Sequence, residues 1–297
     1  MAIVFEEVSF AYGAGSVWHH GALDHISLTL EEGGFIGIAG ETGSGKSTFM
    51  QHLNGLLKPT EGKVKVLDVT IEAGEKSPKL TELRRRVGLV FQFPEHQLFE
   101  DTVEKDIMFG PLNFGVPVEE AKQRASKALQ MVGLSDELLP RNPFQLSGGQ
   151  MRKVAIASVL AMDPQVIVLD EPTATLDPKS RAELAELLNL MCQKEGKTVI
   201  VVTHRMEDML PYADEWLVMK KGRVIFQGTA SEMVGHSVQL AEQGLALPAS
   251  ITYWSQLATR FGLEDEAPQL TAKALAERIG GVIRDQRDQG ASEGGSS

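Results

Sequence analysis

The sequence predicts an α/β protein with a parallel central sheet, preceded by an antiparallel β region and followed by a small helical domain. Nearly continuous apolar runs at residues 35–39, 87–91, 166–169 and 198–202 are typical of strands buried on both faces of a sheet. Helical patterns separate these runs, and strands that alternate with helices indicate parallel pairing through crossover connections. Residues 4–10 and 26–30 instead alternate apolar and polar side chains, which predicts antiparallel strands over roughly the first 70 residues.

Helical patterns with an apolar face occur between the strands and after them. Two such faces consist of Phe49, Leu53, Leu56 and Leu57, and of Leu184, Leu187, Leu188 and Met191. After residue 228 the strand patterns stop, and helices are expected at 231–243, 251–261 and 271–283. We therefore divide the chain into a first domain at 1–228, a C-terminal helical domain at 229–289 and a tail at 290–297. The tail is expected to be disordered, because its residues are small or polar.

Composition narrows the function. The chain has 29 basic and 40 acidic residues and a net charge of −11, which argues against a nucleic-acid partner. Its one cysteine, Cys192, cannot form a disulfide within the chain, as is usual for cytosolic proteins. No apolar run approaches the roughly 18 residues that span a bilayer, so any role at a membrane is expected to depend on another protein.

A glycine-rich loop follows the first parallel strand. It consists of Gly40, Glu41, Thr42, Gly43, Ser44, Gly45, Lys46, Ser47 and Thr48. Strand, loop and helix in this order favour a phosphate-binding loop, because the glycines let backbone N–H groups converge on phosphate oxygens and the helix N-terminus adds partial positive charge. Lys46 is expected to reach the β- and γ-phosphates of ATP, and the Ser47 hydroxyl to bind Mg²⁺.

Two adjacent carboxylates, Asp170 and Glu171, end the apolar run at 166–169. Ligands of α/β proteins bind at this edge of the sheet. Asp170 is expected to hold Mg²⁺ directly or through water, and Glu171 to orient and activate the attacking water. A strand that ends in Asp-Glu is common by itself, so this prediction depends on the phosphate-binding loop.

A second helix start with the chemistry of an anion site consists of Ser147, Gly148, Gly149 and Gln150. Serine followed three residues later by glutamine is a capping-box pattern, and the two glycines allow a close approach to a ligand. Two such starts in one chain are expected if the second faces the γ-phosphate held by another chain. With these motifs the chain resembles the ABC ATPases over residues 3–228, which implies a helical subdomain and a head-to-tail dimer with two ATP molecules between the subunits.

Other residues match this family in order along the chain. Gln92 resembles the glutamine that senses Mg²⁺ and the γ-phosphate, and His204 resembles the histidine that contacts the γ-phosphate. Asp177 resembles the D-loop residue that crosses the dimer interface. Asp177 before Pro178 is also an ordinary helix N-cap, and Thr175 departs from the small residue that is more usual in the family.

Tyr12 matches the aromatic residue that stacks on adenine in this family. Val8, Phe10 and Tyr12 also alternate like one face of a strand, so packing in the core is an alternative for Tyr12. Trp18 is a second candidate for the adenine contact.

Longer segments narrow the resemblance. The segments NGLLKP at 54–59, FQFPEHQLF at 91–99 and EKDIMFGP at 104–111 are similar to ATPases of the energy-coupling factor transporters, closest to the A-prime type. The resemblance implies ATP hydrolysis that powers uptake of vitamins or other micronutrients, at the cytoplasmic face of the cell membrane. It also implies a homologous ATPase partner, in a heterodimer or alternatively a homodimer, beneath an integral membrane T component and a substrate-binding S component.

Two apolar surfaces are candidates for contacts with these partners. Gln97, Leu98 and Phe99, with Ile107 on a helix expected to begin near Asp101, are expected to form a groove for a helix of the membrane partner. In the C-terminal domain, one helical face is expected to pack on the partner ATPase, and it consists of Trp254, Leu257 and Phe261. Packing within the same chain is the alternative for both surfaces.

Other functions of ABC ATPases fit less well. A soluble ATPase of DNA repair or chromosome structure needs a long coiled coil or a DNA-binding insertion, and the sequence has no sustained heptad or basic stretch. A translation factor of this family carries two cassettes, whereas this chain has one. A scaffold without hydrolysis is disfavoured by Glu171, Gln92, His204 and the complete second helix start.

Overall fold

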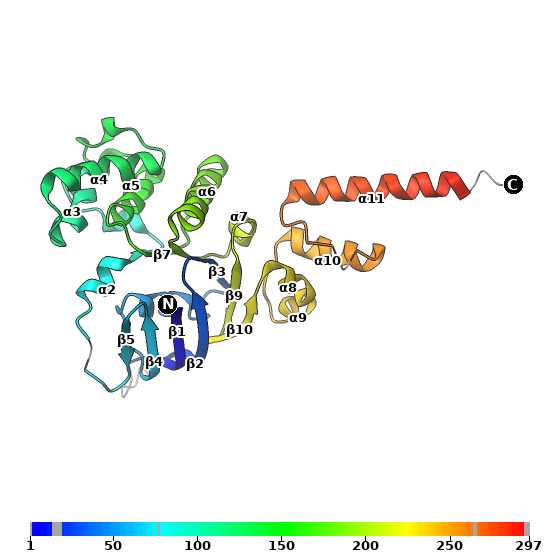
Figure 1. Ribbon diagram of the computed structural model, residues 1–297, viewed down its shortest axis with the longest axis horizontal. Helices are drawn as coiled ribbons and strands as arrows, with labels where there is room; N and C mark the ends of the chain where they lie inside the picture. Colours follow the sequence, from blue (N-terminus) through cyan, green and yellow to red (C-terminus); the bar gives the residue numbers. More distant parts are fainter. Residues whose placement is uncertain (1, 14–19, 77, 264–265, 294–297) are drawn as a thin grey trace.

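A computed structural model describes residues 2–13, 20–76, 78–263 and 266–293. Figure 1 shows the two sheets next to each other, a group of helices on one side of them and the C-terminal helices on the other. None of the helices in the described ranges has the length and apolar character that a bilayer span requires.

The larger sheet has six strands in the order β10-β9-β3-β8-β7-β6. They are β3 (Phe35–Gly40), β6 (Val87–Val90), β7 (Val166–Asp170), β8 (Thr198–Val202), β9 (Glu215–Lys220) and β10 (Arg223–Gly228). Strand β10 is antiparallel to β9, and the other neighbours are parallel. The predicted parallel sheet is confirmed, and the four strands expected from apolar runs end within one residue of their predicted limits.

The smaller sheet is antiparallel and has the order β2-β1-β4-β5, as predicted for the first part of the chain. Its strands are β1 (Ala2–Tyr12), β2 (His20–Glu31), β4 (Glu61–Val66) and β5 (Val69–Glu72). Strands β1 and β2 are longer than their alternating patterns. The register shifts between the pairs Val8–Ile26 and Phe10–Leu23, where His25 has a φ of 47°, and a bulge at this position hides the first part of β2 from a period-two pattern.

Helix α1 (Lys46–Leu53) packs against strands of both sheets. Side chains of β3 alternate between two cores: Ile36 and Ile38 face the core shared with α1 and the smaller sheet, whereas Phe35 belongs to the core on the opposite face. Gly37 has no side chain because a Cβ there would lie 2.5 Å from the ring of Trp216, which is fully buried. The central strand is therefore buried on both faces, as its apolar run predicted.

The first apolar helical face is shorter than predicted. Helix α1 ends at Leu53, because the chain turns at Gly55, which has a φ of 66°. Leu56 and Leu57 lie beyond the helix, and Leu56 is 46% exposed. The prediction that these two residues share a helical face with Phe49 is wrong.

The helical subdomain forms the green group of helices in Figure 1, far from the C-terminus. It contains α3 (Val103–Asn113), α4 (Val118–Met131) and α5 (Gly148–Leu160), with short 3-10 turns at Pro94–Gln97, Asp136–Leu138 and Pro143–Gln145. The remaining helices of the first domain are α2 (Thr81–Arg86), α6 (Pro178–Glu195) and α7 (Met206–Met209). In α6 the predicted apolar face packs inward, with Leu184, Leu188 and Met191 buried.

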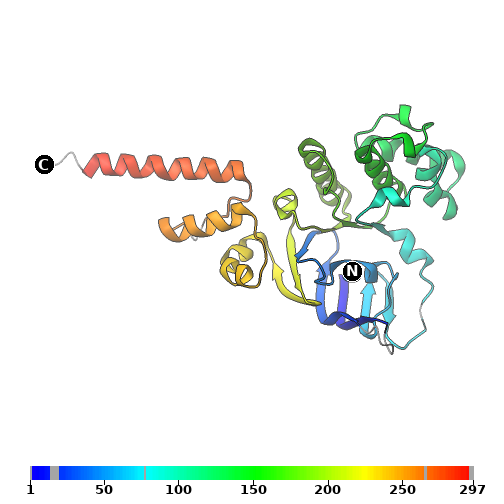
Figure 2. The ribbon, with the colours of Figure 1, turned by 180° about the vertical axis from the view of Figure 1, so that it is seen from behind.

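The C-terminal region is helical, as predicted, but its boundaries differ. It contains α8 (Ala230–Gly235), α9 (Ser237–Glu242), α10 (Ala249–Phe261) and α11 (Ala272–Glu293). The single helix expected at 231–243 is two helices, because the chain turns at His236. Disorder was predicted for 290–297, but residues 290–293 belong to α11, and residues 294–297 lie outside the described residues. Both ribbon views show α11 extending away from the two sheets (Figures 1 and 2).

Much of the apolar surface of this region packs on its own chain. Leu240 and Ile251 are buried in the core under the larger sheet, and Leu245 packs against the same core. Trp254 is 2% exposed and forms a separate cluster with Ala258 and with Leu275 of α11. The prediction that a partner covers the face of Trp254 is therefore wrong, and the alternative of packing within the chain holds for that residue.

Candidate functional site

The glycine-rich loop connects β3 to α1. Gly40 has a φ of 150°, and a Cβ at this position would overlap the carbonyl oxygen of Met219 on β9. Gly45 is the N-cap of α1 with a φ of 102°, and its Cβ would lie 2.5 Å from the carbonyl oxygen of Ala22. Both positions require glycine. The first turn of α1 offers backbone N–H groups that have no partner within the helix, as an anion-binding loop requires.

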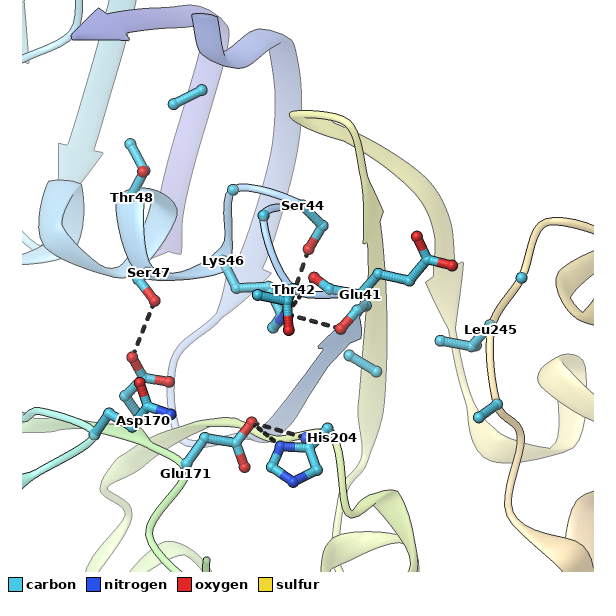
Figure 3. Close-up of a pocket in the computed structure, with 18 of the residues that line it drawn as sticks. Glu41, Thr42, Ser44, Lys46, Ser47, Thr48, Asp170, Glu171, His204 and Leu245 are labelled. Carbon is cyan, nitrogen blue, oxygen red and sulfur yellow. Dashed lines mark hydrogen bonds and ion pairs between the residues drawn. The ribbon is translucent and has the colours of Figure 1, made fainter. Parts of the chain in front are cut away.

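Lys46 lies across this loop. Its Nζ donates hydrogen bonds to the carbonyl oxygens of Gly40 at 2.7 Å and Glu41 at 2.8 Å. Burial lowers the pKa of Lys46, and the carboxylates of Glu171 and Asp170 oppose this effect. Figure 3 shows Lys46 on the loop side of the site, with Asp170 and Glu171 on the opposite side.

Ser47 and Asp170, which come from α1 and from the end of β7, are in direct contact. The Ser47 hydroxyl donates a hydrogen bond to Oδ2 of Asp170 at 3.0 Å. Burial raises the pKa of Asp170, the hydrogen bond from Ser47 opposes this, and the neighbouring Glu171 adds to it. One hydroxyl and one carboxylate oxygen at this distance are the type of donor set that Mg²⁺ prefers. The structure thus brings two of the three expected Mg²⁺ ligands, Ser47 and Asp170, into contact, and the third, Gln92, lines the same cavity.

Glu171 is held by the end of the neighbouring strand β8. Its Oε1 accepts a hydrogen bond from the backbone N–H of His204 at 2.9 Å and lies 2.6 Å from Nδ1 of the same histidine, while Oε2 accepts from the Thr203 hydroxyl at 3.4 Å. Glu171 has a φ of 50°, in the left-handed region that is unfavourable for a non-glycine residue. Strain of this type occurs at functional sites, where surrounding contacts fix a side chain in one position.

These residues line one cavity of about 630 Å³ (Figure 3). The lining consists of Tyr12, His20, Ala22, Ala39, Gly40, Glu41, Thr42, Gly43, Ser44, Gly45, Lys46, Ser47, Thr48, Gln92, Asp170, Glu171, His204, Met206, Gly244, Leu245 and Ala246. Apart from Trp18, the alternative for the adenine contact, the residues expected to bind ATP or to hydrolyse it within this chain therefore lie in one cavity.

Tyr12 is a wall of the cavity and not a core residue. Its side chain is 41% exposed, its hydroxyl lies 3.1 Å from Oγ1 of Thr48, and its ring meets Phe10 edge-on at a centroid distance of 4.9 Å. The alternative of core packing does not hold for Tyr12. Trp18, the second candidate for the adenine contact, lies outside the described residues.

The second helix start does not line this cavity. The capping box is present: Gln150 N–H donates to the Ser147 hydroxyl at 3.3 Å, and Ser147 N–H donates to the Gln150 side chain at 3.0 Å. Ser147 and Gly148 are exposed, so their surface is available to another molecule. Asp177 is also outside the cavity and is the N-cap of α6, where it accepts hydrogen bonds from the backbone of Lys179 and Ser180.

The structure does not form the expected membrane-partner groove as it was predicted. Leu98 is 5% exposed and Ile107 is fully buried, and both belong to the core of the helical subdomain. Phe99 is 57% exposed, and Gln97 is half-buried. Leu98 and Ile107 were expected to form a groove but instead pack inside the subdomain, which was the alternative interpretation.

The helix after this segment begins one residue later than the carboxylates suggested. Its N-cap is Thr102, whose side chain accepts a hydrogen bond from Lys105 N–H, and not Asp101. The exposed aromatic surface that remains consists of Phe93, Phe99 and Phe109, and Phe99 contacts Phe109 edge-on at 4.7 Å.

Three cavity residues come from the C-terminal region and have no signal in the sequence. Gly244, Leu245 and Ala246 lie in the loop between α9 and α10. Lys220 anchors this loop, because its Nζ donates to the carbonyl and side-chain oxygens of Gln243 at 2.6 and 2.8 Å. In Figure 3, Leu245 stands beyond Glu41 and faces the phosphate-binding loop. No motif marks these residues, since only the tertiary fold brings them to the cavity.

The fold and this cavity define an ATPase of the ABC class. The family profile described as ABC transporter matches residues 23–174, about half of the chain. Two solved structures have the same fold at substantial identity. The dimeric ATP-binding cassette MJ0796, bound to ADP and Pi, has a TM-score of 0.70 and 32% identity, and it covers 76% of this chain and 98% of its own. The protein cbiO1 from Clostridium perfringens, described as part of the ABC transporter complex cbiONQ, has a TM-score of 0.68 and 37% identity, and it covers 84% of this chain and 97% of its own.

Curated relatives specify the branch of this class. The energy-coupling factor transporter ATP-binding protein EcfA2 of Bacillus cereus is 51% identical over 284 residues, which is 96% of this chain and 97% of the relative. The proteins of the same name from Geobacillus kaustophilus and Bacillus subtilis are each 50% identical, over 94% and 90% of this chain and 96% of either relative. This chain therefore belongs to the ABC transporter family and, within it, to the energy-coupling factor transporter ATP-binding proteins. The expected fold class, ATPase activity and family are confirmed.

Proposed function

We propose that this chain binds ATP with Mg²⁺ and hydrolyses it as one half of a head-to-tail pair of ATPases, and that this powers the import of a vitamin or another micronutrient. One observation carries the proposal: the Ser47–Asp170 pair and the Glu171–His204 pair face Lys46 within a single cavity. This arrangement supplies a phosphate site, a metal site and a water-orienting carboxylate at the carboxyl ends of β3, β7 and β8.

ATP binding is assigned to the loop and to Tyr12. The loop consists of Gly40, Glu41, Thr42, Gly43, Ser44, Gly45, Lys46, Ser47 and Thr48. Its backbone N–H groups and the N-terminus of α1 bind the phosphates, and Lys46 binds the β- and γ-phosphate oxygens. The half-exposed ring of Tyr12, at the end of β1, stacks on the adenine.

Mg²⁺ is assigned to Ser47 and Asp170, with Gln92 completing the set from the loop after β6. When bound, the ion neutralises negative charge on the β- and γ-phosphate oxygens. Gln92 lies in the same cavity, and its exposed side chain is free to approach the metal and the γ-phosphate.

Glu171 is the residue that orients the attacking water. One carboxylate oxygen is already occupied by His204 and the other by a weak contact from Thr203, so the side chain is fixed with its charge toward the cavity. The carboxylate accepts a hydrogen bond from water and takes its proton as the water oxygen attacks the γ-phosphorus. The bond from the γ-phosphorus to the leaving ADP oxygen breaks in the same displacement. His204 is placed to contact the γ-phosphate through its exposed ring.

The partner assignments follow from the surfaces outside the cavity. Ser147, Gly148, Gly149 and Gln150 form an exposed, capped helix start that faces the γ-phosphate held by the other ATPase, and Asp177 lies at the same interface. The dimeric cassette MJ0796 supports this arrangement. Phe99, with Gln97, contacts an integral membrane T component, which together with an S component holds this chain as a peripheral protein at the cytoplasmic face. The partner ATPase is a homologue, in a heterodimer or alternatively a homodimer.

The test is purification of the full-length tagged chain from detergent-solubilised membranes. A homologous ATPase and an integral membrane protein should co-purify in fixed proportion, and the complex should hydrolyse ATP only when Mg²⁺ is present. The Lys46→Ala variant is the matched control, because it should assemble equally well but lack hydrolysis. A chain that elutes alone and still hydrolyses ATP at the rate of the complex would support a soluble ATPase instead.

A further inference from the structure

Arg152 of α5 is a fully buried cation that lies outside the ATP cavity. It is 0% exposed and does not line the cavity, although it follows the capped helix start by only two residues. A buried guanidinium is stable only if its N–H groups are hydrogen-bonded, since desolvation of an unpaired cation is costly. Its acceptors therefore show which parts of the molecule this side chain holds together.

The acceptors come from two loops at the ATP cavity, the one that follows β6 and the one between β7 and α6. Arg152 Nη2 donates to the backbone carbonyl of Gln92 at 3.1 Å and also to that of Glu171. Nε donates to the carbonyl of Pro172 at 3.0 Å, and Nη1 lies 3.4 Å from the hydroxyl of Thr175. One planar fork thus holds the residue expected to sense the γ-phosphate, the residue that orients water, and the D-loop.

Neutral oxygens hold the Arg152 guanidinium more closely than carboxylates do. Glu95 is the ion-pair partner at 3.8 Å, and its Oε2 is buried without a hydrogen bond. Glu95 lies in the 3-10 turn Pro94–Gln97, which Phe93 and Phe99, two residues with exposed rings, flank in the sequence. The segment that carries the exposed aromatic surface is therefore linked to Arg152 by charge, while the catalytic segments are linked to it by hydrogen bonds.

A buried arginine can serve the fold alone. Two features of its position indicate that Arg152 also has a role in function. First, the carbonyl groups that it holds belong to Gln92 and Glu171 themselves, whose side chains line the cavity. Second, its own helix begins at Ser147, which under the proposed dimer acts on the ATP of the other subunit. Arg152 is the direct connection between these two sets of residues.

We propose that Arg152 is a positioning residue that makes the helix beginning at Ser147 and the backbone of Gln92 and Glu171 move as one unit. The inference rests on the proposed head-to-tail dimer. When the partner's ATP draws the start of α5 toward it, the guanidinium carries Glu171 and Gln92 of the same chain into position over their own ATP. Each chain then joins its two ATP contacts through one side chain that touches neither nucleotide.

The experiment compares Arg152→Gln and Arg152→Lys in the assembled transporter complex. Glutamine removes the charge and most of the fork, and lysine keeps the charge but replaces the planar fork by one ammonium group. We expect kcat of Arg152→Gln to fall about 10- to 100-fold, with a smaller fall for Arg152→Lys. The dissociation constant of ATP for the isolated chain should change less than about threefold, because Arg152 does not line the cavity. Hydrogen exchange should increase at residues 92–95 and 171–175 and remain unchanged in β8.

Lys153→Gln is the matched control on the same helix. Lys153 is the next residue, and its ion pair is with Glu183 of α6 at 3.7 Å, away from the segments that Arg152 holds. This variant should keep the kcat and the exchange pattern of the wild-type complex. It separates the hydrogen bonds of Arg152 from any general effect of changing a cation on α5.

Three results would overturn the proposal. The first is wild-type kcat in a folded Arg152→Gln complex. The second is loss of ATP affinity and kcat in equal proportion with faster exchange throughout the chain, which would show a role in stability alone. If the Arg152→Gln chain does not fold, the third result is a kcat of the Arg152→Lys complex equal to that of the wild type. Failure of the proposed function is distinct, since it would remove Mg²⁺-dependent hydrolysis or assembly from the wild-type protein itself.

Discussion

Leu98 and Phe99 are neighbours for which the structure predicts opposite effects of the same substitution. Phe99 is 57% exposed, and its aromatic contact is the edge-on one with Phe109 at 4.7 Å. Loss of such a contact costs about 0.5–1.5 kcal/mol, which is small beside the roughly 5–15 kcal/mol that stabilises a typical domain. Phe99→Asp should therefore remain folded and bind ATP normally. It should also lose the membrane partner, because it places a charge on a surface that becomes apolar and buried in the complex.

Leu98→Asp should instead unfold the helical subdomain. Leu98 is 5% exposed in the core. Truncating a buried leucine costs about 2–5 kcal/mol, and an unpaired carboxylate adds several kcal/mol more. The environment offers no compensation, since the buried carboxylate of Asp106 already accepts the backbone N–H groups of Phe99 and Glu100 nearby. The sum is comparable with the whole stability of a domain.

The assay combines urea unfolding of the isolated chains with co-purification from membranes. Val238→Asp is the control, because Val238 is 68% exposed on α9 and should affect neither measurement. Assembly of Phe99→Asp at the wild-type level would show that the aromatic surface is not the membrane contact. A Leu98→Asp chain with wild-type stability would refute the reasoning from burial.

Three further predictions test the site and the C-terminal region. Glu171→Gln should lower turnover about 100-fold or more while ATP still binds and holds the dimer together, and near-normal hydrolysis with the partner site changed in the same way would contradict the assignment. Lys46→Ala should weaken ATP binding measured by calorimetry, because the β- and γ-phosphates lose their nearest cation, and an unchanged affinity would remove Lys46 from the phosphate site. Stopping the chain after Gly228 removes Leu240 and Ile251 from the main core, so the free energy of unfolding should fall by about 1.5–3 kcal/mol for each buried side chain. Association with the partner ATPase in the presence of ADP should also weaken. Association in ADP as tight as that of the full chain, measured by sedimentation, would show that the C-terminal region does not tether the pair.

The phosphate-binding loop and the carboxylate pair were predictable because their chemistry is local. Gly40 and Gly45 are required by the backbone of a single turn, and Asp170 and Glu171 end a strand whose apolar run is unmistakable. The capping box at Ser147 is likewise complete within four residues. Features of this kind depend on a few consecutive residues, so they can be predicted from the sequence alone.

Features that depend on tertiary packing were not predictable in the same way. Leu98 and Phe99 have similar apolarity, and only tertiary packing decides that Leu98 is in the core and Phe99 at the surface. The face of Trp254 needed a partner, and the sequence did not show that α11 returns to cover it. Leu245 is far in sequence from the other residues of the ATP cavity and reaches the cavity through a loop that Lys220 anchors.

The position of Leu245 has a thermodynamic consequence. The loop that carries it forms one wall of the ATP cavity and also leads into α10, whose Trp254 packs on α11. We therefore expect an association that displaces α10, and Leu245 with it, to change the free energy of nucleotide binding. Such coupling is reciprocal: nucleotide binding must change the strength of that association by the same factor. The occupancy of the ATP cavity and the affinity with which the C-terminal helices associate with another molecule would then be thermodynamically linked.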